Sequence, residues 1–194
     1  MIVASALLLT GCSQNNEAAT IGDFKISQTE LQSSIDAVMA ERAKIDSSQM
    51  QLESGEELNR GQLRFKILMH TFDEIAKELK IEVTSSAIEA KKATLLNSIG
   101  GAAELPKNLV NAAIALQDFD TYIRAIVISD QVAAALSQSG VAAEEVSAKV
   151  GELLNAKAKS LGVKINPRYG FWDNEAGDVV AANVTGDAVK PSVK

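Results

Sequence analysis

The sequence predicts a mainly α-helical protein: about five helices around a long central helix, with a small sheet joining the N-terminal strand to a strand after the last helix. Three observations support this fold class. The 194 residues include only three prolines, fewer than the usual ~5%, so long segments contain no helix breaker. Aromatic residues make up 4% of the chain, which disfavours a β-sandwich or barrel. Apolar residues recur at helical spacing along most of its length.

The N-terminal segment is expected to be an export signal followed by a tether. Residues 2–9 form an apolar run, too short for the ~20 residues that span a bilayer but suited to the core of a signal peptide. The run ends in Leu9-Thr10-Gly11-Cys12, which resembles the bacterial lipobox. That resemblance implies a signal peptide over residues 1–11, lipid on Cys12 and a tether over 12–17. The chain would then be anchored to a membrane of the bacterial cell envelope, facing outside the cytoplasm.

A strand pair and a capped helix are expected next. Residues 18–26 alternate around Gly22-Asp23, a turn dipeptide, which predicts a hairpin or a kinked strand. The tetrapeptide S-Q-T-E that begins at Ser27 has capping-box spacing, so a helix should begin there. The polar segment 47–55 is expected to be a loop.

Four further helices are predicted at about residues 58–79, 84–99, 107–137 and 142–161, each with apolar positions three and four residues apart. The helix over 107–137 would be the longest, about 45 Å at ~1.5 Å per residue. It is apolar on two sides, as expected for the central helix of a bundle. A short alternating strand follows at 163–165.

Aromatic residues concentrate in the segment that closes the predicted domain. Residues 166–173 hold three of the eight aromatic residues of the chain. The side chains of Arg168, Tyr169, Phe171 and Trp172 are expected to cover the end of the helical body, or else to contact a partner protein. The sequence after this segment, 174–194, has no period and is expected to be a flexible tail.

Short motifs along residues 18–173 resemble the N-terminal domain of SurA-type periplasmic chaperones and PrsA-type foldase lipoproteins. The segments that carry the resemblance are Ile21-Gly22-Asp23, Ile26-Ser27, Glu30-Leu31, Val83-Thr84 with Ala87 and Glu89, and Val163 to Asp173, the last being similar to related actinobacterial lipoproteins. The resemblance implies helices around a long central one, closed by a small sheet. The parvulin isomerase module of these families has no counterpart, because only the short junction 137–141 stands in its place and His70 is the single histidine.

The function favoured by the resemblance is a lipid-anchored, chaperone-like protein that binds unfolded or newly exported polypeptides, without catalysis and without a cofactor. Flexible or aromatic apolar side chains suit such binding, although a helical apolar stripe is normally core. The candidate peptide-binding residues of this kind are Met39, Met50, Phe65, Met69, Phe72 and Tyr122. A docking subunit for one fixed envelope protein is the alternative hypothesis.

Composition and spacing argue against other function classes. With 19 basic and 25 acidic residues the formal charge is −6, which does not suit nucleic-acid binding. One histidine and one cysteine do not make a protein-built metal site. The set His70, Asp73 and Glu74 is interpreted as a solvated helix face with ion pairs between neighbouring turns. Paired carboxylates such as Glu144-Glu145 diverge on a helix, so a prolyl isomerase or other enzyme is not expected.

Overall fold

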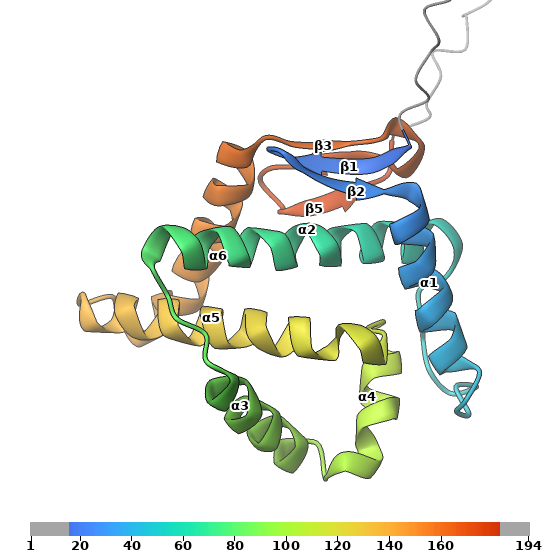
Figure 1. Ribbon diagram of the computed structural model, residues 1–194, viewed down its shortest axis with the longest axis horizontal. Coiled ribbons are helices and arrows are strands. Elements are labelled where there is room, and N and C mark those ends of the chain that lie inside the picture. Colours follow the sequence, from blue (N-terminus) through green and yellow to red (C-terminus); the bar gives the residue numbers. More distant parts are fainter. Residues whose placement is uncertain (1–15, 183–194) are drawn as a thin grey trace, which may run out of the picture.

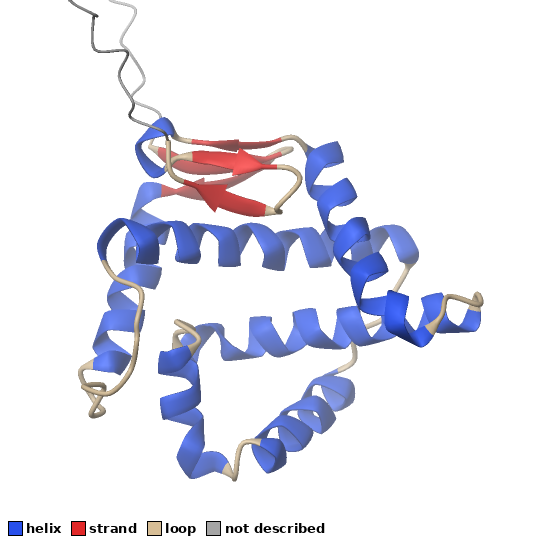
Figure 2. Cartoon of the chain, turned by 180° about the vertical axis from the view of Figure 1, so that it is seen from behind, coloured by secondary structure: helices blue, strands red, loops and turns tan. Residues whose placement is uncertain are grey.

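The computed structural model describes residues 16–182, which form six α-helices and five strands (Figures 1 and 2). The helices are α1 (Gln28–Arg42), α2 (Gly55–Leu79), α3 (Ser85–Ser98), α4 (Leu105–Asn111), α5 (Phe119–Gln138) and α6 (Ala143–Leu161). The strands are β1 (Glu17–Ile21), β2 (Phe24–Ser27), β3 (Val163–Ile165), β4 (Phe171–Asp173) and β5 (Asp178–Val180). The predicted fold class, mainly helical with a small antiparallel sheet, is confirmed.

A three-stranded antiparallel sheet brings the two ends of the described chain together. Strand β1 lies in the middle, between β2 and β3, and Ile21 pairs with Val163. The predicted hairpin turns at Gly22, whose φ of 57° lies in the left-handed region that favours glycine. The backbone N–H of Gly22 also donates to the carbonyl of Leu161 at 2.9 Å, so the hairpin contacts the end of α6. The predicted pairing of the first strand with the strand after the last helix is therefore confirmed.

Local capping explains where the helices begin and end. The hydroxyl of Ser27 accepts a hydrogen bond from the backbone N–H of Glu30 at 3.0 Å, which confirms the predicted start of α1. The hydroxyl of Thr84 caps α3 in the same way. Gly162 ends α6 with a left-handed φ of 72°.

The prediction of one continuous helix over 107–137 is wrong. Helix α4 ends at Asn111, Ala113 turns the chain with a left-handed φ of 52°, and a 3-10 turn leads into α5. The side-chain amide of Gln62 on α2 is buried and donates to the carbonyl of Ala113 at 2.6 Å, which stabilises this corner. Leu109 before the break and Ile123 after it belong to the same apolar cluster. Apolar residues therefore continue at helical spacing across the break, although the helix does not.

The central helix is α2, which at 25 residues is the longest helix between residues 16 and 182. In Figure 1 it lies between the sheet and α5. Its buried Leu63 and Ile67 pack beneath the sheet, Phe65 packs against α4 and α5, and Ile75 packs between α5 and α6. One helix therefore supplies side chains to all three apolar clusters.

The predicted tail from residue 174 is wrong for its first part. Strand β5 pairs antiparallel with β4, and Val179 is buried in the cluster beneath the sheet. The Asp173 carboxylate accepts from the backbone N–H groups of Glu175 and Ala176, which fixes the intervening turn and lowers the pKa of Asp173. A strand of three residues is too short to show a period. The rest of that prediction, 183–194, lies outside the described residues.

The predicted signal peptide and Cys12 also lie outside the described residues. The predicted tether is wrong at residue 17, because β1 begins at Glu17 and the Glu17 carboxylate pairs with Lys25. From residue 16 to 182, none of the helices combines the length and the apolar character that crossing a bilayer requires.

Candidate functional site

Four of the six candidate peptide-binding side chains line one groove between α2 and the corner that joins α4 to α5. Phe65, Met69 and Phe72 come from α2, and Tyr122 comes from α5. Each of the four is half-buried, and Phe65, Phe72 and Tyr122 also pack against the apolar core. The groove has a volume of about 400 Å³. We call it the α2 groove.

The spacing of the α2 residues explains how they share this groove. Phe65, Met69 and Phe72 lie four and three residues apart, so their side chains follow one another along one face of the helix. The opposite wall is the segment 112–114, which the Gln62 amide fixes in place. The break in the predicted long helix is therefore what forms one wall of the groove.

A second hollow of about 260 Å³ lies next to the α2 groove and shares Phe65 and Met69 with it. Its other lining residues come from β2, from the start of α1, from α2 and from the start of α5: Phe24, Glu30, Lys66, His70, Asp73, Asp118 and Thr121. The rings of Phe24 and His70 stack, with centroids 4.1 Å apart and planes inclined by 10°. Phe24 is 40% exposed and adds an aromatic surface that the sequence analysis did not single out.

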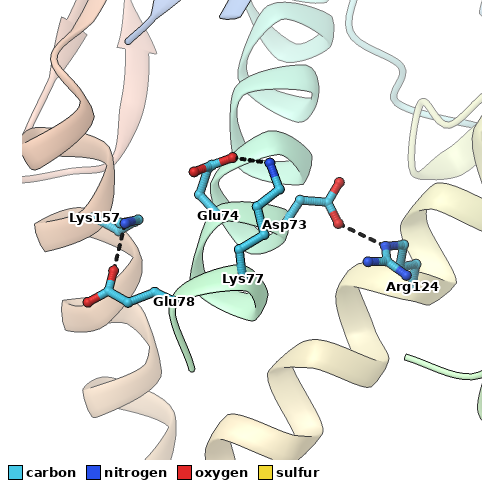
Figure 3. A network of polar contacts seen from close by, with 6 residues as sticks. All are labelled: Asp73, Glu74, Lys77, Glu78, Arg124 and Lys157. Atoms are coloured by element: carbon cyan, nitrogen blue, oxygen red, sulfur yellow. Dashed lines mark hydrogen bonds and ion pairs between the residues drawn. The ribbon is translucent and has the colours of Figure 1, made fainter. Parts of the chain in front are cut away.

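Charged residues in the second half of α2 form three ion pairs, two of them with other helices (Figure 3). Asp73 on α2 pairs with Arg124 on α5 at 2.8 Å, and Glu78 on α2 pairs with Lys157 on α6 at 2.6 Å. Glu74 and Lys77 pair within α2, three residues apart. In residues 16–182 no three histidine, cysteine or acidic side chains are placed to hold a metal ion. Glu74 therefore pairs with a neighbouring turn of its own helix, as predicted, whereas the partner of Asp73 lies on α5.

The stability of the fold is expected to fall as the pH drops below the ordinary pKa of histidine, 6.5. Burial lowers the pKa of His70 and outweighs the nearby Glu74 and Asp73 carboxylates, which act to raise it, while Lys77 lowers it further. The folded state therefore favours the neutral ring. The contribution of the neutral His70 ring to the free energy of unfolding is complete above pH 6.5. It is lost as the pH falls from 6.5 through the lowered pKa of His70. Denaturant unfolding between about pH 7.5 and 5.5 measures this slope. The His70→Gln variant should flatten the slope, and an unchanged slope would assign it to other groups.

The other two candidate peptide-binding residues lie away from the groove. Met39 is 50% exposed on α1, and its sulfur accepts a long hydrogen bond from Arg42. Met50 belongs to the loop between α1 and α2, which is the loop predicted from the polar segment 47–55. Neither residue lines the α2 groove or the neighbouring hollow.

The four residues of the closing segment divide into two groups. Trp172 is 8% exposed and Tyr169 packs against the same apolar cluster, beneath the sheet. The guanidinium of Arg168 lies over the Tyr169 ring, 5.3 Å from its centroid, and donates to the side chain of Gln28. Trp172 and Tyr169 therefore pack inward, and Arg168 contacts Tyr169 and the first residue of α1. Phe171 faces outward and is 49% exposed, as a partner contact would require.

Glu53 places a carboxylate at the rim of the α2 groove. Its backbone carbonyl accepts a hydrogen bond of 2.6 Å from the buried Arg42, which positions the end of the loop. The carboxylate lies over Gly61 on α2, where an added Cβ would be only 2.5 Å from Glu53 Oε2. Nothing in the sequence pattern brings Glu53 to Gly61, because the contact depends on how the loop folds back.

The Gly61→Ala variant is expected to be slightly more stable than the unaltered chain, by about 0.5 kcal/mol. Alanine is the better residue in a helix interior, and the atom that its Cβ would meet is the movable end of an exposed Glu53 side chain. The denaturant midpoint measures the change. Gly151→Ala in α6 is the matched control, because no atom lies within 4 Å of an added Cβ there. A loss of stability in Gly61→Ala alone would mean that the Glu53 carboxylate is rigidly held.

Comparisons with known proteins give no family for this chain. No family model, no curated protein and no solved structure matches it. The resemblance to SurA-type and PrsA-type proteins remains a hypothesis that rests on the short motifs quoted above.

Proposed function

We propose that this chain is a lipid-anchored, extracytoplasmic chaperone-like protein that holds unfolded or newly exported polypeptides without catalysing a reaction. The observation that carries the proposal is the α2 groove, in which two phenylalanines, a tyrosine and a methionine converge from two helices. A mixed aromatic and methionine lining adapts to client side chains of different shapes. The lipobox would place this groove near the membrane from which exported chains emerge.

Binding in such a groove would be weak and reversible. An aromatic client side chain that buries ~200 Å² contributes about 5 kcal/mol at ~25 cal/mol per Å². This is close to the lower end of the cost of association, about 4–15 kcal/mol. A single client segment therefore binds transiently, and an unfolded chain with several apolar segments is held longer. The net charge of −6 helps the free protein to remain dispersed beside its own apolar surface.

A docking subunit for one fixed envelope protein is the second candidate function. The exposed Phe171 on β4 favours it. A further small apolar hollow between α2 and α6, where Leu79 and Leu153 are exposed, offers another contact surface. A docking surface would bind one partner with high selectivity, whereas a holding groove binds many unrelated unfolded chains.

Suppression of client aggregation tests the proposal. The chain from Ser13 to Lys194, which contains every described residue, is mixed with a refolding client, and light scattering is followed at several molar ratios. Suppression at near-stoichiometric amounts is the expected result. No effect at large excess would contradict the proposal and favour the docking function. Prolyl isomerase activity above background in the same protein would contradict its non-catalytic part.

A further inference from the structure

We infer that the α2 groove selects client segments in which a bulky apolar side chain is followed or preceded closely by lysine or arginine. The inference rests on the proposed function, since it names the class of polypeptide held at the same site. The observation behind it is that the α2 groove has a mainly apolar lining, and that the groove and the neighbouring hollow together include two carboxylates that form no ion pair with a lysine or arginine of the described residues.

The charges that line the two hollows do not cancel. The carboxylates are those of Glu30, Glu53, Asp73 and Asp118, and the lysine and arginine side chains are those of Lys66 and Arg64. Both cations already have acidic partners, since Lys66 pairs with Glu30 at 3.3 Å and Arg64 pairs with Asp178 at 3.4 Å. Asp73 is neutralised by Arg124, which does not line either of these hollows.

Two carboxylates therefore remain without a cation. Among residues 16–182, no lysine or arginine nitrogen lies within 4 Å of the carboxylate of Glu53 or Asp118. Asp118 accepts a long hydrogen bond of 3.5 Å from Ser34 and also lies at the N-terminus of α5, where the helix dipole favours a negative charge. Glu53 is exposed and, within residues 16–182, its carboxylate forms no ion pair, although Arg42 binds its backbone carbonyl, so it is the better acceptor for a client cation.

The position of Glu53 suits a client residue that is apolar along its length and charged at its end. Arg42 positions the Glu53 backbone, and Gly61 leaves room for the carboxylate beside the groove that Phe65 lines. The aliphatic stem of a lysine or arginine can lie along an apolar floor while its charged end reaches a rim carboxylate. A neighbouring aromatic side chain of the client would then occupy the groove itself. A client with acidic residues at the same places would be repelled.

Three labelled peptides test the inference, with the chain from Ser13 to Lys194 and fluorescence anisotropy as the readout. They share one core of phenylalanine and leucine residues and differ only in flanking residues, which are lysine, serine or glutamate. The expected order of affinity is lysine, then serine, then glutamate. Each step should be about two- to fivefold, the size of a solvent-exposed ion pair. The order should weaken at high salt, because exposed charges are screened.

The Glu53→Gln variant should bind the lysine peptide two- to fivefold less tightly and the serine peptide equally well. Glu145→Gln is the matched control, because it removes the same charge from an exposed position on α6 that lines neither hollow. Equal binding of all three peptides, with aggregation suppression intact, would overturn the inference and leave the proposed function standing. An equal loss in both variants would also overturn it, since net charge alone would then explain the preference. Binding of no peptide, together with no aggregation suppression, would overturn the proposed function as well.

Discussion

The double variant Phe65→Ala with Phe72→Ala is expected to protect an unfolded client at least tenfold less effectively than the unaltered chain. Both rings line the α2 groove, and each replacement removes aromatic surface that a client would cover. A tenfold loss corresponds to about 1.4 kcal/mol of binding free energy. The concentration that halves client light scattering measures it.

Both phenylalanines also pack against the core, so the double variant needs a control for lost stability. Leu154→Ala provides this control, because Leu154 is half-buried against the same apolar cluster as Phe72 but does not line the groove. Each variant is compared at a temperature where circular dichroism reports a folded protein. Equal loss of protection in both proteins would contradict a specific role of the groove.

The Gly170→Ala variant is expected to lose about 2–4 kcal/mol of folding free energy, or roughly 5–15 °C in Tm. Gly170 has a φ of 117°, and an added Cβ would lie 2.0 Å from the backbone carbonyl oxygen of Val180. A backbone atom cannot move aside as a flexible side chain does. The strand β5 would therefore separate from β4, and Val179 would leave the apolar cluster beneath the sheet. Calorimetric or circular dichroism melting measures the loss.

Gly101→Ala separates the two causes of that loss. Gly101 has a similar φ of 105°, but no atom lies within 4 Å of an added Cβ. It should therefore show the backbone strain alone and a smaller loss of stability. If both variants lost the same amount, the contact between Gly170 and Val180 would not be the reason, and the packing of β5 would contribute little.

Local rules were sufficient for most of the fold. The turn at Gly22-Asp23, the hydroxyl caps of Ser27 and Thr84 and the left-handed Gly162 are each determined by a few adjacent residues. They appear in the sequence as they do in the structure. The pairing of β1 with β3 was also predictable, since both strands flank the helical region.

The parts that could not be predicted depend on contacts between distant residues. The corner at Ala113 is stabilised by Gln62, 51 positions earlier in the chain, and no proline or glycine between Lys107 and Gln138 marks it. The strand β5 is identified only by its pairing with β4. At the Ala113 corner and at β5, the apolar pattern of the sequence is compatible with two backbone conformations, and contacts with distant residues determine which one forms.

The residues of the candidate site likewise divide into those that helical spacing places and those that it does not. Helical spacing was enough to place Phe65, Met69 and Phe72 on one face, and Tyr122 proved to lie opposite them. Met39 and Met50 have the same chemical character but face other surroundings, because spacing within one helix does not say which helices meet. Phe24 and Glu53 reach this region from a hairpin and a loop, where no period marks a shared face.

Site-specific photo-crosslinking shows whether the α2 groove holds unfolded polypeptides. A photoreactive phenylalanine analogue replaces Phe72 in the groove, and in separate proteins it replaces Phe171 or Met39, which are exposed elsewhere. We expect crosslinks from position 72 to several unrelated unfolded clients and to none of them in the native state. Crosslinks of equal yield from positions 171 and 39, or crosslinks to a single folded envelope protein from position 171 alone, would contradict it.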